Sequence, residues 1–244
     1  MNNTFPAILL LALGLPGFSC AAQKQPVVYV SAAISPYERE AMASVMLLNT
    51  DGEHSPSCGG VAIKRSGLTV LATAAHCVRH KIDPFDPAPN AEREAKLGDT
   101  IMYSTKGWSP FVPRLNRKST IVDLDEVHDR AILYPVQDEA PAPLDVAELC
   151  DRCTTQPVQV HAIAPVFGWA QHEGVITGRT YAGGSNWFYE SSVSINFGWS
   201  GSPVINSDGR VVGITIACNS VEVLDGDHAV KTCLPDWSVF TSIQ

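Results

Sequence analysis

The sequence predicts an all-β protein built from two successive sets of short strands. Three observations support this prediction. Short apolar segments recur at close intervals, Gly, Pro, Asn and Ser separate them, and no long amphipathic helix pattern interrupts the series. With 244 residues, of which 45% are apolar and 17% charged, the chain can bury a large core. A double barrel of this size commonly counts as one structural unit.

The first set of strands is expected within residues 41–136. Its candidates cover residues 43–48, 59–64, 68–73, 96–103, 119–124 and 130–136. Between the third and fourth candidates, residues 74–79 suit a single helical turn that carries His76. Residues 82–93 hold three prolines among acidic residues, and proline cannot donate to a central strand, so we expect a surface loop there.

The second set of strands is expected within residues 158–236. Residues 137–157, rich in proline and acidic residues, are expected to cross between the two sets. The candidates of the second set cover residues 158–166, 174–181, 187–194, 203–206 and 211–217. Beyond them, residues 237–243 are expected to form at most a short helix.

The N-terminal residues 1–22 have the character of a secretory signal, with a polar start, an apolar run and small residues near the end. The apolar run is shorter than the roughly 20 residues that span a membrane, which argues against a retained membrane anchor. After removal of the signal, we expect no stable membrane insertion. Lipid modification of Cys20 is an alternative that the preceding residues fit poorly. Residues 23–40 are expected to be an extended leader. The net charge of −8 and the lack of a basic run argue against a nucleic-acid partner.

The cysteine count favours an oxidising compartment. Without Cys20, six cysteines remain, and an even set behind a signal predicts three disulfides. The six are Cys58, Cys77, Cys150, Cys153, Cys218 and Cys233. The spacing of Cys150 and Cys153 also suits a redox pair or half a metal site. The sequence has no second cysteine pair with this spacing and no thioredoxin-like pattern around Cys150 and Cys153. A local disulfide bond between these two cysteines is therefore favoured.

Three polar residues along the chain have the chemistry of nucleophilic catalysis. Ser200 stands in the tight turn Gly198-Trp199-Ser200-Gly201, where a backbone can approach a substrate carbonyl. His76 suits the general base, and Asp129 would fix its tautomer. The backbone N–H groups of Gly198 and Ser200 would stabilise the oxyanion.

Alternatives exist for two of these residues. Asp123 and Asp125 lie near Asp129, which is preferred because the alternating Ala131 and Leu133 place it at the mouth of an apolar strand. His76 and His80 stand four residues apart, as metal ligands on a helix do. No Glu completes a zinc-protease arrangement, and we expect neither a metal nor another cofactor.

Four sequence motifs of this chain resemble motifs of the chymotrypsin-like (trypsin-like) serine proteases. The resemblance rests on Cys58-Gly59-Gly60-Val61-Ala62-Ile63, Thr73-Ala74-Ala75-His76-Cys77, Asp129-x-Ala131-x-Leu133 and Gly198-x-Ser200-Gly201-Ser202-Pro203. It implies two orthogonal six-stranded antiparallel β-barrels with the active site between them, in a protease domain over residues 41–244. It also implies a disulfide between Cys58 and Cys77.

One residue departs from the digestive and clotting members of this family. Those members place an Asp before the nucleophile, where it pairs with a new N-terminus made by zymogen cleavage, whereas this chain has Trp199 and no Ile-Val-Gly-Gly activation site. The turn looks closer to bacterial secreted and periplasmic members. The resemblance therefore leaves open how a loop with Trp199 holds the amides of Gly198 and Ser200.

The resemblance also locates a specificity pocket. Its floor would be Ser194, six residues before the nucleophile, with Ile195 beside it. Thr215, Ile216 and Ala217 would line a wall. Because none of these residues is charged, and because a charged substrate group would lose its hydration there without a partner, we expect an uncharged pocket that takes an apolar or small side chain.

The predicted function is a secreted or periplasmic serine endopeptidase that hydrolyses protein or peptide substrates through an acyl-enzyme. One alternative is a catalytically silent binding or adhesion module on the same fold, with a collapsed oxyanion loop. Another is a zymogen that requires removal of the leader at residues 23–40.

Overall fold

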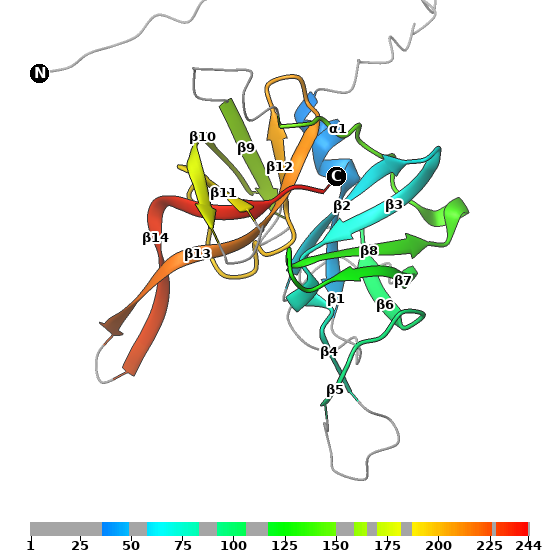
Figure 1. Cartoon of the computed structure of the whole chain (residues 1–244), viewed down its shortest axis with the longest axis horizontal. Helices are drawn as coiled ribbons and strands as arrows, with labels where there is room; N and C mark the ends of the chain where they lie inside the picture. The colour runs from blue at the N-terminus through cyan, green and yellow to red at the C-terminus, as the bar shows by residue number, and fades with distance from the viewer. Residues whose placement is uncertain are drawn as a thin grey trace, which may run out of the picture. The chain divides into compact units, whose positions relative to one another are not determined.

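A computed structural model describes residues 36–48, 58–82, 92–105, 117–149, 159–164, 170–181, 187–225 and 228–243. The proposed signal peptide, most of the leader, Cys150 and Cys153 lie outside these residues. Most of the described chain is β-structure (Figure 1). None of its helices has the length and apolar character needed to cross a membrane.

The first barrel closes through six antiparallel strands in the order β1-β2-β3-β8-β7-β6. Its strands are β1 (Ser44–Leu48), β2 (Cys58–Arg65), β3 (Leu68–Thr73), β6 (Thr100–Ser104), β7 (Arg117–Asp125) and β8 (Arg130–Pro135). Each overlaps a strand expected from the sequence. The 3-10 helix η1 (Ala75–Cys77) follows β3 and carries His76, as the sequence predicts.

The second barrel closes in the order β10-β11-β14-β13-β12-β9. Its strands are β9 (Gln159–Ala164), β10 (Ala170–Tyr181), β11 (Trp187–Ser191), β12 (Pro203–Asn206), β13 (Val211–Asp225) and β14 (His228–Thr241). The all-β fold with two closed six-stranded barrels is therefore confirmed. The outer parts of β13 and β14 form a two-stranded arm that extends from the second barrel (Figure 1).

The end of the second barrel differs from the sequence-based expectation. Strand β14 runs to Thr241, past the predicted boundary at residue 236, through residues that were expected to form at most a short helix. It pairs with β11 through Tyr189 and Phe240 and with β13 through Ile214 and Thr241. Because this strand closes the barrel, pairing with distant strands overrides the local preference for a helix.

Smaller elements also depart from the prediction. The leader was expected to be extended to residue 40, but helix α1 (Pro36–Ala43) forms its end, with proline at the first helical position, where its missing N–H is tolerated. Glu40 is buried in this helix and accepts a hydrogen bond from His161 Nε2 at 2.8 Å. The expected loop at residues 82–93 is flanked by a two-stranded sheet of β4 (His80–Ile82) and β5 (Glu92–Glu94). A second 3-10 helix, η2 (Gln137–Glu139), follows β8.

The core consists of three apolar clusters, one within each barrel and one that combines residues of both. The combined cluster brings Ile63 and Ile132 of the first barrel together with Ile163 and Ile214 of the second. Fully buried aliphatic side chains of this kind each contribute about 1.5–3 kcal/mol by leaving water. The two barrels are thus packed against each other, which fixes the side chains that project between them.

Candidate active site

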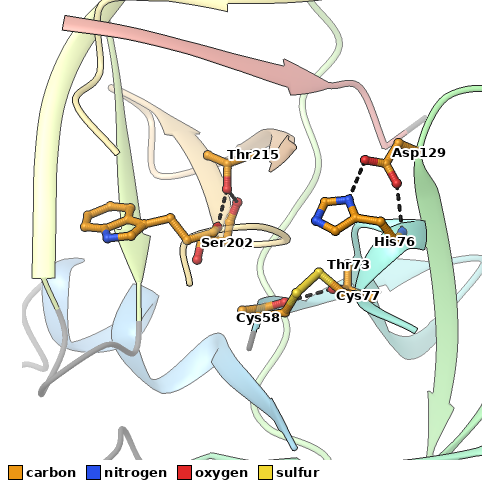
Figure 2. The surroundings of a disulfide bond; sticks show 9 residues. Cys58, Thr73, His76, Cys77, Asp129, Ser202 and Thr215 are labelled. Carbon is orange, nitrogen blue, oxygen red and sulfur yellow. Dashed lines mark hydrogen bonds and ion pairs between the residues drawn. A yellow bond between two sulfur atoms is a disulfide. The ribbon is translucent and has the colours of Figure 1, made fainter. Parts of the chain in front are cut away.

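His76 and Asp129 form a two-point contact. The His76 ring donates from Nδ1 to Asp129 Oδ2 at 2.7 Å, and the His76 backbone N–H donates to Asp129 Oδ1 at 2.9 Å. In Figure 2 the carboxylate lies on one side of the ring, and Ser202 and Thr215 of the second barrel lie beyond the other side. Because Asp129 holds Nδ1 and its proton, Nε2 is left to accept a proton from that second side.

Asp129 is the aspartate, among the three considered, that contacts His76. Asp123 instead pairs with Arg65 at 3.4 Å on the surface. Asp125 accepts from the backbone N–H and the ring of His128, at 3.1 and 2.7 Å. Asp129 itself has a positive φ of 49°, which few residues other than glycine adopt.

The hydrogen bonds of Asp125 stabilise the turn that presents Asp129. Arg130 Nη2 also donates to the Asp125 carboxylate, at 3.1 Å, so residues on both sides of Asp129 are held by one side chain. Burial opposes the charge of Asp125, but hydrogen bonds from His128 and the charges of His128 and Arg130 lower its pKa below the ordinary value. The sequence shows that Asp125, His128 and Arg130 lie close to Asp129 along the chain, but it does not show that their side chains form these hydrogen bonds.

The pKa of Asp129 is lowered by the same kind of contact. Burial by itself would raise the pKa, but the hydrogen bonds from the His76 ring and backbone outweigh it, and the pKa falls below its ordinary value of 3.8. The carboxylate is consequently ionised throughout the neutral range, as the orienting partner of a histidine base must be.

This shift predicts a pH-dependent contribution to stability. Because the folded-state pKa of Asp129 lies below the unfolded value, its contribution is complete above pH 3.8 and is lost as the pH falls through the folded-state pKa. We expect the free energy of unfolding to fall more steeply below pH 3.8 for the wild type than for Asp129→Asn, as measured by urea denaturation across pH. Parallel pH curves for the two proteins would contradict this expectation.

The turn that carries Ser200 is tied to the first barrel. The Gly59 N–H donates to the Ser200 carbonyl at 2.7 Å, and Thr73 Oγ1 donates to the Gly59 carbonyl at 2.8 Å. A disulfide joins Cys58 to Cys77, the neighbours of Gly59 and His76, as the resemblance implies. The described residues show no hydrogen bond between the Ser200 hydroxyl and the His76 ring. Such contacts often shorten only when substrate binds.

Two amides of the turn are available to a ligand. Within the described part of the chain, neither the Gly198 N–H nor the Ser200 N–H donates a hydrogen bond, whereas Trp199, Gly201 and Ser202 all donate to backbone carbonyls. Gly198 has φ 87°, a conformation that L side chains rarely adopt. Amides left without acceptors in a tight turn suit the stabilisation of a developing negative oxygen.

Trp199 anchors this turn in the second barrel. Its side chain is only 4% exposed and belongs to the apolar core of that barrel. Its ring stacks on His172 of β10, with centroids 4.8 Å apart, and its carbonyl accepts hydrogen bonds from the Ser202 N–H and from Thr215 Oγ1. His172 Nδ1 also donates to the Ser194 carbonyl at 2.5 Å. The two ends of the segment from Ser194 to Trp199 are therefore held by one imidazole.

Gly201 shows how closely the two barrels approach at this turn. Its φ is 79°, and an added Cβ would collide with the Gly59 carbonyl oxygen and Thr73 Oγ1. We expect Gly201→Ala to destabilise the protein by about 3–5 kcal/mol, the sum of backbone strain and overpacking, measured by chemical denaturation.

Gly67 provides the matched control for this prediction. It has a similar φ of 80° but nothing within 4 Å of an added Cβ. Gly67→Ala should therefore cost only the strain of the left-handed conformation, about 1–2 kcal/mol. Equal destabilisation by the two substitutions would show that close approach is not what requires glycine at position 201.

The residues predicted to line the pocket divide into two groups. Ile195 and Thr215 are buried, Ile195 in the core of the second barrel and Thr215 with its hydroxyl bonded to the Trp199 carbonyl, so neither offers a wall to a substrate. Ser194 and Ile216 are half-buried, and Ala217 is exposed. Sequence reasoning missed Asp236, whose carboxylate lies against the Ser194 hydroxyl.

Ligand atoms of Cys58, His76 and Cys77 lie within 4.8 Å of one another, the spacing of a metal site. The two sulfur atoms are bonded to each other, however, so neither can act as a thiolate ligand. A second disulfide joins Cys218 to Cys233 at the base of the β13–β14 arm.

Comparison with known proteins extends these observations. Residues 58–214 match the family model described as a trypsin-like peptidase domain. No curated protein sequence matches the chain. Among solved structures, the MamO protease domain from Magnetospirillum magneticum is similar, with a TM-score of 0.53 and 17% identity over 84% of this chain and 93% of that one.

Two further solved structures are similar to the same degree. The Rv3671c protease of M. tuberculosis, in an inactive form, has a TM-score of 0.53 and 14% identity over 85% of this chain and 87% of that one. Deg5 has a TM-score of 0.53 and 17% identity over 75% and 82%. Because the sequence identities are only 14–17%, the similarity to these solved structures shows a shared fold and nothing more.

Proposed function

The chain belongs to the trypsin-like peptidase family, and on this basis we propose that it is a serine endopeptidase in which Ser200, His76 and Asp129 form the catalytic triad. The observation that carries the proposal is the two-point contact between Asp129 and His76, which orients the imidazole and leaves its Nε2 free to accept a proton. The two amides of the Ser200 turn that lack acceptors give further support.

Each group has a defined role in the proposed reaction. Ser200 Oγ attacks the carbonyl carbon of the scissile peptide bond while His76 Nε2 takes the hydroxyl proton. The carbonyl oxygen becomes negative and accepts hydrogen bonds from the N–H groups of Gly198 and Ser200. His76 then returns the proton to the leaving amine, which leaves an acyl-enzyme on Ser200. A water molecule, deprotonated by His76, hydrolyses that ester.

Labelling with a fluorophosphonate tests the proposal. The reagent phosphonylates a serine that is activated by a base beside an oxyanion hole, so we expect labelling of the wild type at Ser200 and none of Ser200→Ala. His76→Ala should label far more slowly, because the base is missing. Absence of labelling in the folded wild type, or equal labelling of Ser200→Ala, would contradict the proposal.

The binding-module alternative requires a collapsed oxyanion loop, and no observation favours it, because the amides of Gly198 and Ser200 are not engaged by other described groups. The zymogen alternative depends on leader residues that lie almost wholly outside the described chain. Comparing peptidase activity before and after limited proteolysis tests the zymogen alternative: a large rise in activity would support it.

We further propose that the protein acts outside the cytoplasm on protein or peptide substrates. The disulfides Cys58–Cys77 and Cys218–Cys233 support this proposal, because such bonds persist in oxidising compartments. The proposed signal at residues 1–22 is consistent with it. Fractionation of expressing cells, with the mature N-terminus read by mass spectrometry, tests both points.

A further inference from the structure

The segment that leads into the Ser200 turn runs along strand β10 before it turns. The Ser192 N–H donates to the Val175 carbonyl at 2.9 Å, and the Val175 N–H donates to Ser192 Oγ at 3.0 Å. The contact with β10 continues to Ser194, whose carbonyl accepts a hydrogen bond from His172 Nδ1 at 2.5 Å. The chain therefore enters the turn directly from residues that β10 holds in place.

The form of the turn sets the direction of the Gly198 N–H. The Trp199 N–H donates to the Asn196 carbonyl at 3.1 Å, which closes a four-residue turn. Gly198, its third residue, has a φ of 87°, and Phe197, its second, is not among the residues with positive φ, as in a type II turn. The Gly198 N–H belongs to the central peptide, which a type I turn would rotate by about 150°. The amide faces a substrate only while the turn keeps one form.

His172 contacts this region on both sides of the turn. Its ring stacks on the indole of Trp199, with centroids 4.8 Å apart and an angle of 28° between the planes, while its Nδ1 donates to the Ser194 carbonyl. The His172 backbone is itself fixed, because the residue pairs with Ala162 of β9 inside the second barrel. One side chain on a paired strand thus holds the residue before the turn and the last residue of the turn.

Packing in the core does not explain the presence of His172, because its side chain is exposed. A ring without polar atoms would stack on Trp199 as well, whereas the imidazole adds a donor that the Ser194 carbonyl uses. The residue before Ser200 is a tryptophan and carries no charge, so an ion pair at this position cannot order the turn. The two contacts of His172 supply such order without an ion pair.

We propose that His172 is a positioning residue for the reaction, and that its two contacts keep the amides of Gly198 and Ser200 aimed at the substrate carbonyl oxygen. This proposal rests on the proposed peptidase function. His172 touches no reacting atom and acts through the Ser194 carbonyl and the Trp199 ring. When either contact is lost, the turn populates forms in which the Gly198 N–H points away. Only the fraction of molecules in the donating form then catalyses the reaction, and kcat falls by that fraction.

Three substitutions separate the two contacts. His172→Phe keeps a ring for Trp199 and loses the donor, whereas His172→Asn keeps a donor near the position of Nδ1 and loses the ring. We expect kcat for a peptide substrate to fall about threefold to tenfold in each, the usual worth of one hydrogen bond or one aromatic contact. His172→Ala loses both contacts and should lower kcat about thirtyfold or more.

The division between kcat and KM distinguishes positioning from a general loss of structure. KM should stay within about twofold of the wild-type value, because the two amides act mainly on the negative oxygen of the transition state. Glu173→Ala is the matched control: Glu173 is the exposed neighbour of His172 on β10 and points to the opposite face of the strand, so its removal should keep the wild-type kcat. A wild-type kcat in His172→Ala, or a loss of kcat/KM that comes from KM alone, would overturn the proposal.

Hydrogen exchange separates this proposal from the peptidase proposal, because it needs no catalysis. The N–H groups of Trp199, Gly201 and Ser202 all donate to backbone carbonyls, so an ordered turn protects them. Measured by mass spectrometry on a peptide covering residues 194–202, exchange should be about tenfold or more faster in His172→Ala than in the wild type. Strands β3 and β8 should exchange at the same rate in both proteins, which shows that the variant is folded.

The combination of exchange and fluorophosphonate labelling gives distinct outcomes. Faster exchange in His172→Ala, together with no labelling of the wild type, would support the role of His172 in ordering the turn and contradict the peptidase function alone. Equal exchange of residues 194–202 in the wild type and His172→Ala would overturn the role of His172, whether or not the wild type is labelled.

Discussion

Replacing Ser200 with alanine is expected to lower kcat for a peptide substrate on the order of a million-fold, the cost of removing the nucleophile from a serine-protease triad. In the proposed mechanism the hydroxyl oxygen is the atom that forms the acyl-enzyme, and the amides of Gly198 and Ser200 in the same turn donate to no described group. KM should change little, because substrate binding does not require the covalent bond.

The fold should be unaffected by this change, since the Ser200 hydroxyl makes no hydrogen bond to the described residues and its removal leaves no partner unsatisfied. Ser207→Ala, at an exposed position in the turn between β12 and β13, serves as the control and should keep full activity. Retention by Ser200→Ala of more than about one hundredth of the wild-type kcat would rule out Ser200 as the nucleophile.

Asp129→Asn is expected to lower kcat by about four orders of magnitude, the effect of this change in a Ser-His-Asp triad. The asparagine amide can donate to His76 Nδ1, which forces the proton onto Nε2 and prevents the ring from accepting one from Ser200. The asparagine oxygen can still accept from the His76 backbone N–H, and asparagine tolerates the φ of 49° at this position, so the fold should be retained.

Asp123→Asn is the matched control for this prediction. Asp123 lies nearby on β7 and pairs with Arg65 at the surface, an interaction worth at most about 1 kcal/mol. Steady-state kinetics should show near wild-type kcat for Asp123→Asn. Similar losses of kcat in the two variants would show that Asp129 has no special relation to the base.

The contacts of His76 and Asp129 follow closely what the sequence predicts, because their motifs are local. His76 lies in a short segment that follows β3 directly, and Asp129 immediately precedes an apolar strand whose alternation is visible in Ala131 and Leu133. The closure of two barrels could also be predicted, since the strand pattern and the family motifs agree with each other.

What the sequence did not predict depends on pairing between distant residues. Strand β14 contains Pro235 and Asp236, which interrupt any strand pattern, and it becomes a strand because it pairs with β11 and β13. Helix α1 is too short to show a clear helical repeat of apolar residues in the sequence. Its buried Glu40 accepts a hydrogen bond from His161, which is 121 residues away in the chain. Asp236 likewise reaches Ser194 only through the irregular register of β13 and β14.

The burial of Trp199 has a consequence for the alkaline range of pH. In family members that order this turn with a chain-end amine, the ion pair raises the pKa of the amine above its ordinary value of about 8, and the pair is lost once the pH exceeds that raised pKa. The buried indole of Trp199 carries no charge that depends on pH in this range. The anchoring of the Ser200 turn by Trp199 is therefore expected not to depend on pH in the alkaline range.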